Sequence, residues 1–480
     1  MSDFTNISRR GLFGTAAAIG AASMLNPIGK AMAQGAPAAG AAQQIPRGEY
    51  VVRNACVLTM DPQIGNLLNG DVHVRNGAIV AVGANLAAPG AEVIDGKGMI
   101  VMPGMIETHW HMWGAVARNM AGDDEKHGYF PYSRVLGQLF TPEDNARGVR
   151  LALAEAINGG ITTVNNWSHN LLSPEYADAE IKTHIDVGGR ALFSYGYSRK
   201  TQRDETLPLK DVARVQKQWF GAPVDGLLTL GIATRGPENN TLEIVREEIE
   251  TARKLGVRIT SHMGTDAERV VKAKGIKVLA GANLLGPDVL LVHDTNTNEE
   301  DLHTLAATKT PVSMSPFTEG RTGFGITPVL DFLRVGVPVS LSVDTTLLCG
   351  NADMFAIMKA IQNLADAVAK SEFGLPAARI LQMSTMDGAR ALGLEDKVGS
   401  LTPGKRADLI VVRTDAVNML PFTEPVHMIV QSAQPSNVDL VMVDGRILKR
   451  NGKLTTIDLP RLAAEAAETV ARINVAVKDF

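Results

Sequence analysis

The 480-residue sequence lacks several features that would place it in a specialised class of protein. It has two cysteines, Cys56 and Cys349, which exclude a disulfide framework and favour buried thiols over a single bridge. Its net charge is −4, so no broad basic field favours nucleic acid as a partner. Hydrophobic residues make up 45% and charged residues 20%, which indicates an ordinary globular protein able to bury a large core.

Long apolar runs are also missing, since residues 14–25 fall well short of the roughly 20 apolar residues that cross a membrane. This run follows Ser8-Arg9-Arg10-Gly11 and precedes the small residues Ala31-Met32-Ala33, a pattern typical of a twin-arginine export signal. We predict a signal peptide over residues 1–33 and a flexible leader over residues 34–48. The mature protein is expected to be periplasmic and not in a membrane; a disordered basic start is the alternative.

Short strand patterns occur near both ends of the remaining chain. They occupy residues 50–52, 71–74, 78–82, 408–412 and 438–443. Asn76-Gly77 and Asp444-Gly445 are hairpin signals within them. Because neither group is long enough for a core of its own, we predict one composite β-sandwich domain built from residues 49–102 and 397–455.

Between these two regions, apolar runs alternate with helical patterns. The runs are 100–106, 161–164, 191–195, 227–233, 257–261, 289–292, 311–314 and 338–343. Thr141 and Thr241 have the character of helix N-caps, and Gly256 ends the second helix. Eight such units indicate an α/β fold, a (β/α)8 TIM-type barrel over residues 103–396, followed by a helix in residues 456–480. An open doubly wound sheet is the alternative, but no glycine-rich dinucleotide loop follows the first run.

Metal-binding side chains follow several of these runs at the same end of the predicted barrel. His109 and His111 end the first run, and their spacing lets both point to one side of a strand. His262 follows the fifth run and Asp344 follows the eighth. Since the active sites of such barrels lie at the carboxyl ends of the strands, we predict that these four residues hold one divalent metal. Imidazole and carboxylate ligands with an open position favour catalytic Zn²⁺, with Fe²⁺ as the alternative.

Two residues are candidates for catalysis at this metal. The metal would lower the pKa of a bound water, and Asp344 could accept the water's proton and pass it to the leaving group. His293 follows the sixth run, and we predict that it polarises the carbonyl or ring carbon of the substrate. A packing role in the core is the alternative for His293.

Other residues are secondary candidates. Trp110 and Trp113 could stack on a planar substrate or pack against loops, and His169 follows the second strand, where it could contact substrate. Charged side chains in the loops are expected to be solvated, and a subset of them could belong to a lid: His127, Arg235, Glu238, Glu319 and Arg321. The remaining histidines lie away from the active strand ends and receive no role: His73, His184, His303 and His427.

Residues 103–111, PGMIETHWH, resemble a signature of the amidohydrolase superfamily, in the branch of triazine chlorohydrolases and cytosine- and adenosine-type deaminases. Residues 289–293 and 341–344 resemble the family's sixth- and eighth-strand motifs, and residues 398–409 resemble its return into the β-domain. The resemblance covers Tyr50 to Leu454. It implies a metal-dependent hydrolase that cleaves a non-peptide carbon–nitrogen bond in a small cyclic or aromatic molecule.

Two departures from the family pattern refine this expectation. Binuclear members carry a carboxylated lysine on the fourth strand, and residues 227–233 contain none, so one metal is expected. Deaminases of this branch carry a glutamate three residues after the fifth-strand histidine, where this chain has Thr265. Threonine can donate a hydrogen bond but is a poor proton shuttle at neutral pH, so we expect Thr265 to contact the substrate. Asp266 could replace the glutamate, but it stands one position out of register.

Three hypotheses on function remain after these considerations. The first is hydrolysis of an amide or cyclic amide, and the second is an aminohydrolase or chlorohydrolase of a nitrogen heterocycle that uses Asp266 or water in place of the glutamate. The third is a non-catalytic barrel that binds a ligand or serves as a scaffold, which the complete set of ligands disfavours. The first two hypotheses imply a small-molecule substrate. The sequence leaves open whether the protein forms a homo-oligomer.

Overall fold

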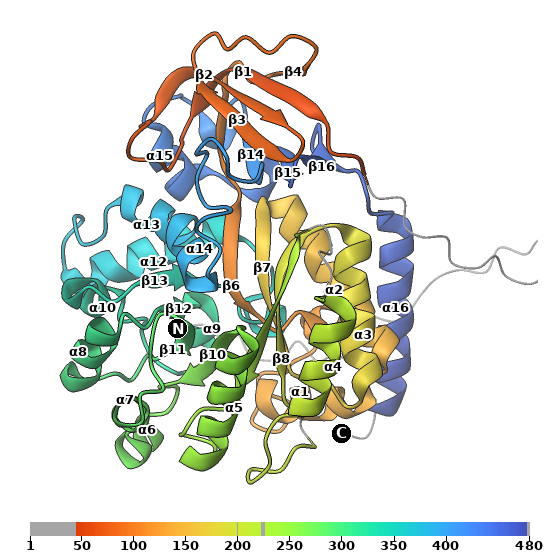
Figure 1. Cartoon of the computed structure of the whole chain (residues 1–480), viewed down its shortest axis with the longest axis vertical. Coiled ribbons are helices and arrows are strands. Elements are labelled where there is room, and N and C mark those ends of the chain that lie inside the picture. Colours follow the sequence, from red (N-terminus) through yellow and green to blue (C-terminus); the bar gives the residue numbers. More distant parts are fainter. Residues whose placement is uncertain (1–44, 199, 222–225, 478–480) are drawn as a thin grey trace, which may run out of the picture. The chain divides into compact units, whose positions relative to one another are not determined.

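The computed structural model describes residues 45–198, 200–221 and 226–477 (Figure 1). The predicted signal peptide and residues 34–44 of the predicted leader lie outside the described residues, so both stay predictions. Residues 45–48 have no regular secondary structure. In the described part of the chain, no helix is both long and apolar enough to cross a membrane.

Eight parallel strands, neighbours in the order of the sequence, form the central barrel (Figure 1). They are β6 (Met105–Trp110), β7 (Ile161–Ser168), β8 (Arg190–Gly196), β9 (Leu228–Thr234), β10 (Arg258–Met263), β11 (Val289–His293), β12 (Val312–Met314) and β13 (Val339–Leu341). Nearly every residue of these strands is buried, as expected where helices cover one face and side chains fill the other. The predicted (β/α)8 architecture is confirmed.

The barrel closes between its first and last strands. The Asp344 amide donates to the carbonyl of His109 at 2.8 Å, and the His111 amide donates to the carbonyl of Asp344 at 2.7 Å. Deeper in the barrel, the Thr108 hydroxyl donates to the carbonyl of Leu341 at 2.9 Å. These bonds form a seam that joins the two segments carrying His109, His111 and Asp344.

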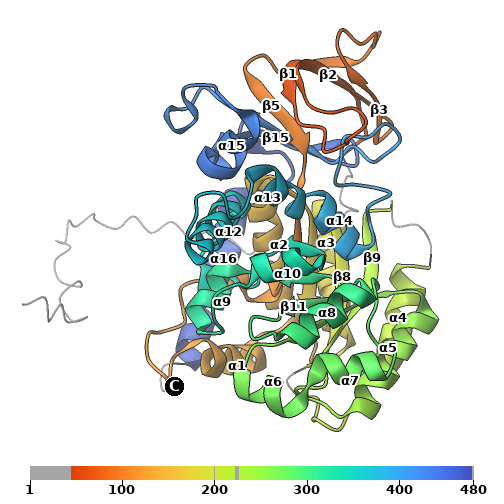
Figure 2. The same ribbon diagram turned by 90° about the vertical axis from the view of Figure 1, so that its left-hand side faces the viewer.

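Helices surround the barrel and occupy the connections between its strands (Figure 2). They are η1 (Met112–Ala117), α1 (Tyr129–Leu139), α2 (Pro142–Gly159), α3 (Pro174–Val187), α4 (Leu209–Trp219), α5 (Leu242–Leu255), α6 (Ala267–Ala273), α7 (Gly275–Gly281), α8 (Glu299–Thr308), α9 (Pro316–Thr322), α10 (Val329–Val335), α11 (Thr346–Cys349), α12 (Met354–Ala369), α13 (Ala377–Met383) and α14 (Met386–Leu392). Thr141 caps α2 in a reciprocal capping box with Asp144, and Thr241 caps α5. Gly256 ends α5 with a φ of 68°, so the predicted caps are confirmed.

A second sheet combines strands from both ends of the described chain. Its strands are β1 (Glu49–Val57), β2 (Leu67–Arg75), β3 (Ala78–Gly83), β4 (Glu92–Asp95), β5 (Met99–Pro103), β14 (Leu409–Arg413), β15 (Val438–Val443), β16 (Arg446–Arg450) and β17 (Lys453–Leu454). Strand β5 pairs with β1 in parallel and with β14 in antiparallel register, which makes one continuous mixed sheet of the two halves. Val52 and Val101 share a core with Val411 and Leu440, so the halves bury a common apolar face.

The predicted hairpins of this composite sheet are present. Asn76-Gly77 joins β2 to β3 and Asp444-Gly445 joins β15 to β16, and all four residues have positive φ. Between β14 and β15 the chain forms short turns of helix, η2 (Val417–Met419), α15 (Pro425–His427), η3 (Met428–Ser432) and η4 (Pro435–Asn437). The final helix, α16 (Leu459–Ala476), lies along α2, where Arg150 forms an ion pair with Glu465 at 2.8 Å (Figure 1).

The first predicted strand, residues 100–106, requires correction. The structure divides it between β5 of the composite sheet and β6 of the barrel, with Gly104 at the junction. A β-carbon on Gly104 would lie 2.1 Å from the Thr162 side chain, so only glycine fits this crossing. The apolar pattern continues through Gly104 because the residues on both sides of it are buried, β5 in the composite sheet and β6 in the barrel. The sequence pattern therefore does not show where one strand ends and the next begins.

A buried ion pair fastens the composite sheet to the barrel. Arg190, the first residue of β8, donates to Asp408 at 2.6 and 3.0 Å, and both side chains are at most 2% exposed. Asp408 also accepts the Asp444 amide at 2.8 Å. Both carboxylate oxygens of Asp408 therefore have partners, and the pair is a well-satisfied contact between the two sheets.

We expect Arg190→Ala to lower the free energy of unfolding by about 3–5 kcal/mol, because it leaves the Asp408 carboxylate buried without its cation. The control is Arg246→Ala, which removes a half-exposed pair with Glu250 and should cost less than about 1 kcal/mol. Urea unfolding followed by circular dichroism measures both. Equal midpoints for the two variants would show that the Arg190–Asp408 pair does not fasten the sheets together.

Candidate metal centre

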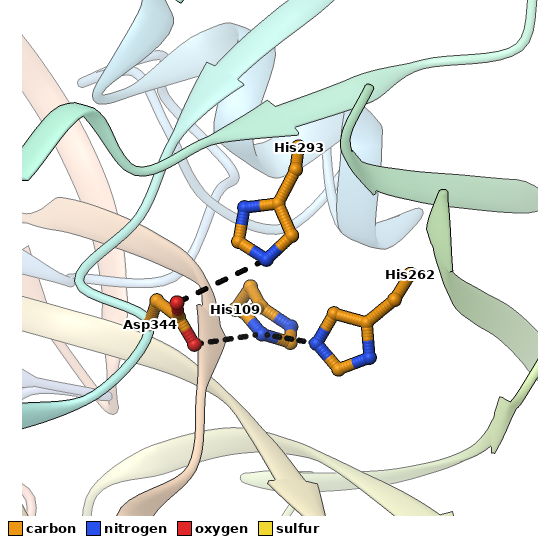
Figure 3. Close-up of side chains that lie close together, drawn as sticks. All are labelled: His109, His262, His293 and Asp344. Atoms are coloured by element: carbon orange, nitrogen blue, oxygen red, sulfur yellow. Dashed lines mark hydrogen bonds and ion pairs between the residues drawn. The ribbon is translucent and has the colours of Figure 1, made fainter. Parts of the chain in front are cut away.

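The predicted metal ligands gather at the carboxyl end of the barrel. His109 lies on β6 with His111 just beyond it, His262 lies on β10, and Asp344 follows β13. Figure 3 shows His109, His262, His293 and Asp344 pointing toward one another. One nitrogen or carboxylate oxygen from each of these four lies within 4.8 Å of all the others. Residues up to 235 positions apart thus meet at one point.

His111 joins the same cluster through Asp344. The Nε2 atoms of His109 and His111 each lie 3.3 Å from Asp344 Oδ1. The Nε2 atoms of His109 and His262 lie 3.2 Å apart, and His293 Nε2 lies 3.9 Å from the other oxygen, Asp344 Oδ2 (Figure 3). His109 and His111 therefore lie beside Asp344 Oδ1, His262 lies beside His109, and His293 approaches from the Oδ2 side.

The protonation states of the cluster suit a divalent cation. Burial, reinforced by the neighbouring imidazoles, holds the pKa of His109, His111 and His262 well below the usual value. These rings are therefore neutral near pH 7 and present nitrogen lone pairs. Burial raises the pKa of Asp344 to about 6, which leaves it ionised at neutral pH. Neutral imidazoles with one carboxylate are the donors that zinc and similar ions prefer, so the residues present fit a divalent metal site.

Backbone conformations at the site are strained. His293 and Asp344 have φ values of 75° and 65°, in the left-handed region that costs residues other than glycine about 1–3 kcal/mol each. His293 is the last residue of β11, and Asp344 lies three residues beyond the end of β13. The strain turns both side chains toward the barrel axis, and the surrounding barrel holds them there.

Glu107 forms hydrogen bonds with the backbone next to the predicted ligands, which its position in the sequence motif did not indicate. It is fully buried on β6, and its Oε1 accepts the amides of His109 at 2.7 Å and Val343 at 3.1 Å. Burial raises its pKa to about 8. Glu107 therefore ties the strand of His109 to the segment before Asp344 and adds a side chain to the seam.

A cavity of about 240 Å³ opens onto the cluster. The lining residues are His111, Tyr129, Phe130, His169, Tyr197, His262, Thr265, His293, Thr318, Thr322, Phe324 and Asp344. Four aromatic rings therefore face a space that also contains polar groups and the ligands. Both secondary candidates His169 and Thr265 lie on its wall.

The structure corrects the prediction that Trp110 and Trp113 contact a substrate. Trp110 is fully buried and Trp113 is 2% exposed, and neither lines the cavity. The Trp113 indole instead donates to His169 Nδ1 at 3.3 Å, behind the cavity wall. Trp167 is also fully buried and packs against a ligand, with its ring centroid 4.1 Å from that of His262. The tryptophans pack against the site residues and do not form the binding surface.

The structure also removes Asp266 from the candidates for the missing glutamate. Asp266 is exposed and caps α6 by accepting the Arg269 amide at 2.9 Å, so its carboxylate serves a helix and not the cavity. Asn166, on β7, turns its side chain away toward α3, where it donates to Glu180 at 2.9 Å. Neither residue belongs to the cavity wall.

Glu319 belongs to the surroundings of the cluster, whereas the sequence predicted a solvated side chain. It lies on α9, is completely buried, and places Oε1 3.2 Å from Nδ1 of His293. The same oxygen accepts the Ser315 amide at 2.8 Å, and the Thr327 hydroxyl donates to the other oxygen. Burial lowers the pKa of His293, but the hydrogen bond to Glu319 and the charges of Asp344 and Glu319 outweigh it and raise that pKa above its usual value.

Comparisons with known proteins agree with this architecture. A model described as the amidohydrolase family matches residues 100–448. The 5'-deoxyadenosine deaminase of Methanosarcina acetivorans is 32% identical over 444 residues, 89% of this chain and 99% of the relative. A 5-methylthioadenosine/S-adenosylhomocysteine deaminase of Desulfitobacterium hafniense is 30% identical over 433 residues, 86% of this chain and 96% of the relative.

Solved structures share the fold. A zinc-bound adenosine deaminase from Xanthomonas campestris superposes with a TM-score of 0.82 at 24% identity, covering 89% of this chain and 99% of that one. The atrazine chlorohydrolase of Arthrobacter aurescens complexed with zinc gives a TM-score of 0.77 at 22% identity, covering 88% and 100%. The barrel with its composite sheet is therefore an architecture known in zinc-bound enzymes.

Metal affinity should fall in acid because protons compete for the ligands. The metal-free carboxyl of Asp344 has a pKa of about 6, so each pH unit below that value should weaken the apparent affinity by about tenfold or more. Competition with a chromogenic chelator between pH 7.5 and pH 5 measures this, and His109→Ala serves as the variant expected to bind no metal. An affinity that stays constant down to pH 5 would exclude Asp344 as a ligand.

Proposed function

Because the chain belongs to the amidohydrolase family, we propose that it is an aminohydrolase that releases ammonia from a nitrogen heterocycle of the adenine-nucleoside type. The chain is a hydrolase of carbon–nitrogen bonds other than peptide bonds. The observation that carries the finer proposal is the likeness to deaminases over 99% of a relative's length, together with an intact ligand cluster. It favours the deaminase hypothesis over hydrolysis of an amide.

His109, His111, His262 and Asp344 would hold one ion, and we propose zinc. A divalent ion bound there supplies a Lewis acid that lowers the pKa of water and so provides a nucleophile near neutral pH. Asp344 Oδ1 faces His109 and His111, whereas Oδ2 faces His293. Oδ2 is therefore the oxygen placed to take a proton from water and pass it to the departing amine.

His293 and Glu319 could together transfer the proton that a glutamate after the fifth strand transfers in related deaminases. Thr265 stands in its place on the cavity wall, and a hydroxyl shuttles protons poorly at neutral pH. His293 carries a buried carboxylate on its Nδ1 side and faces the cluster with Nε2. Glu319 accepts the proton of Nδ1, so the Nε2 atom is the one that donates to, or accepts from, the reacting ring.

The cavity wall suits a planar ring. Tyr129, Phe130 and Phe324 supply aromatic faces for stacking. His169 adds a defined polar group, because its Nδ1 accepts from Trp113 and the neutral ring then carries its proton on Nε2. His169 is thus set up as a hydrogen-bond donor to the substrate.

We further propose that the enzyme works in the periplasm. The support is the Arg9-Arg10 motif with its apolar run and small residues before position 34. Twin-arginine export carries folded proteins, so the metal would be loaded before export. Replacement of both arginines by lysine should retain the protein in the cytoplasm in a fractionation experiment.

Ammonia release tests the proposed reaction directly. The zinc-loaded enzyme should release ammonia from 5'-deoxyadenosine or a similar 6-aminopurine nucleoside, and His109→Ala should release none because it lacks the ion. Enzyme-coupled ammonia detection measures both, with hydantoins and dihydropyrimidines as amide substrates in parallel. Ring opening of a cyclic amide with no ammonia from any aminopurine would return the function to the amide hypothesis.

Glu319→Ala should reduce kcat by about 10- to 100-fold with little change in KM or zinc content, because His293 loses the acceptor that fixes its tautomer. Glu319→Gln, which keeps an acceptor oxygen, should lose less. The control is Glu248→Gln, a buried glutamate that accepts the Leu207 amide away from the metal site and should leave kcat unchanged. Wild-type kcat in both Glu319 variants, or loss of zinc from both, would contradict a positioning role.

A further inference from the structure

The loop that follows β11 joins two parts of the cavity wall. These parts carry Thr265, in the loop after β10, and Phe324, in the loop after α9. Between His293 and α8 the chain contains two consecutive Thr-Asn pairs, Thr295-Asn296 and Thr297-Asn298. The first pair forms hydrogen bonds with the backbone of both wall segments, whereas the second pair lies at the start of α8.

The side chains of the first pair connect two backbone carbonyls. Asn296 Nδ2 donates to the carbonyl of Gly264 at 2.8 Å and to that of Phe324 at 3.1 Å. The Thr295 hydroxyl donates to the same two oxygens, at 3.2 and 3.0 Å. Because a side-chain amide has two N–H donors, Asn296 can satisfy both carbonyls at once. We call Thr295 and Asn296 the Thr-Asn bridge.

The Gly264 end of the bridge is fixed by other contacts. The Gly264 amide donates to Glu238 Oε1 at 2.9 Å, and the Gly264 carbonyl also accepts the backbone amide of Asn296 at 3.0 Å. Gly264 is buried and comes directly after β10, the strand that carries the ligand His262. This end is therefore a fixed point to which the bridge attaches the other wall segment.

The position of Phe324 depends on the bridge. Its neighbours Gly323 and Gly325 have φ values of 73° and 128°, where glycine is favoured, and glycine leaves the backbone free to adopt other conformations. The Phe324 amide donates to the carbonyl of Glu319 at 3.0 Å. The hydrogen bonds of the described residues give the Phe324 carbonyl two donors, both from the bridge. Removal of these donors would leave that carbonyl without a protein partner.

The ring of Phe324 connects the bridge to the reacting groups. Its centroid lies 5.3 Å from that of His293, in an edge-to-face arrangement, and 6.1 Å from that of Phe130. All three side chains line the metal cavity. A displaced Phe324 ring would therefore change both the surface on which a planar substrate stacks and the packing of His293.

We propose that Thr295 and Asn296 are positioning residues that hold Phe324 against His293 and beside the substrate ring. The inference rests on the proposed function, because it assumes a planar ring in the metal cavity. The described lining of the cavity includes neither side chain, so both act through Phe324 and not by touching the substrate. A displacement of about 1 Å can reduce turnover by about 100-fold, which is why hydrogen bonds outside the cavity can control the reaction.

The two Thr-Asn pairs provide a matched test. In the bridge variant, Thr295→Val with Asn296→Leu, both side-chain donors are lost while the side-chain size is nearly kept. We expect KM for 5'-deoxyadenosine to rise at least about tenfold at unchanged zinc content, because Phe324 is no longer held. Thr295→Ser with Asn296→Leu retains one hydroxyl donor and should recover part of the loss.

The control variant is Thr297→Val with Asn298→Leu, which makes the same substitutions two residues later. Among the described residues the Thr297 hydroxyl has no hydrogen-bond partner, and Asn298 caps α8 by accepting the Asp301 amide at 3.0 Å. This variant should lower the melting temperature, because α8 loses its cap, and leave KM within about twofold of the wild type.

A double-mutant cycle with Phe324→Ala separates positioning from a general effect on the fold. If the bridge acts through the Phe324 ring, the two bridge substitutions should change kcat/KM by less than about twofold when that ring is already absent. Losses that multiply in the combined variant, or a wild-type KM in the bridge variant, would overturn the proposal.

Hydrogen exchange distinguishes failure of this proposal from failure of the aminohydrolase assignment. Residues 323–327 should exchange faster in the bridge variant than in the wild type and the control variant. If they do, but no aminopurine is deaminated, the bridge holds Phe324 and the reaction assignment is wrong. If an aminopurine is deaminated with the same KM and the same exchange in all three proteins, the reaction assignment stands and the positioning role is wrong.

Discussion

Closure of the barrel between β6 and β13 is the constraint on which the site depends. Two backbone hydrogen bonds join Asp344 to His109 and His111, and Glu107 adds one more across the same seam by accepting the Val343 amide. Because these bonds run between the metal ligands themselves, the register of the last strand pair sets the distances of the cluster. The composite sheet contributes from the other side, since the Gly104 crossing and the Arg190–Asp408 pair fix where β6 and β8 begin.

The electrostatics of the cluster then follow from burial. Burial lowers the pKa of the clustered imidazole rings, so these rings stay neutral, and the Asp344 carboxylate lies among them. Such a cluster satisfies its lone pairs best around a cation, so metal binding and folding of this end of the barrel are coupled. The strained conformations of His293 and Asp344 are compatible with this, because a bound ion offsets part of their cost.

Much of this arrangement could be predicted from local sequence patterns. The strand runs gave the barrel, and His109, His111, His262 and Asp344 were identifiable because each follows a run at its carboxyl end. Glu319 was not, since it lies on a short helix after the next strand and reaches His293 only through tertiary packing. The orientation of Trp110 was equally hidden, because an aromatic residue beside a ligand has the same sequence whether it faces the cavity or the core.

X-ray absorption at the metal edge of the purified protein tests the central claim most directly. The account predicts one ion per chain, nitrogen and oxygen neighbours at about 2.0–2.1 Å, and outer-shell scattering from three imidazole rings. Sulfur at about 2.3 Å, or a second metal at about 3.5–4 Å, would contradict a single ion held by His109, His111, His262 and Asp344.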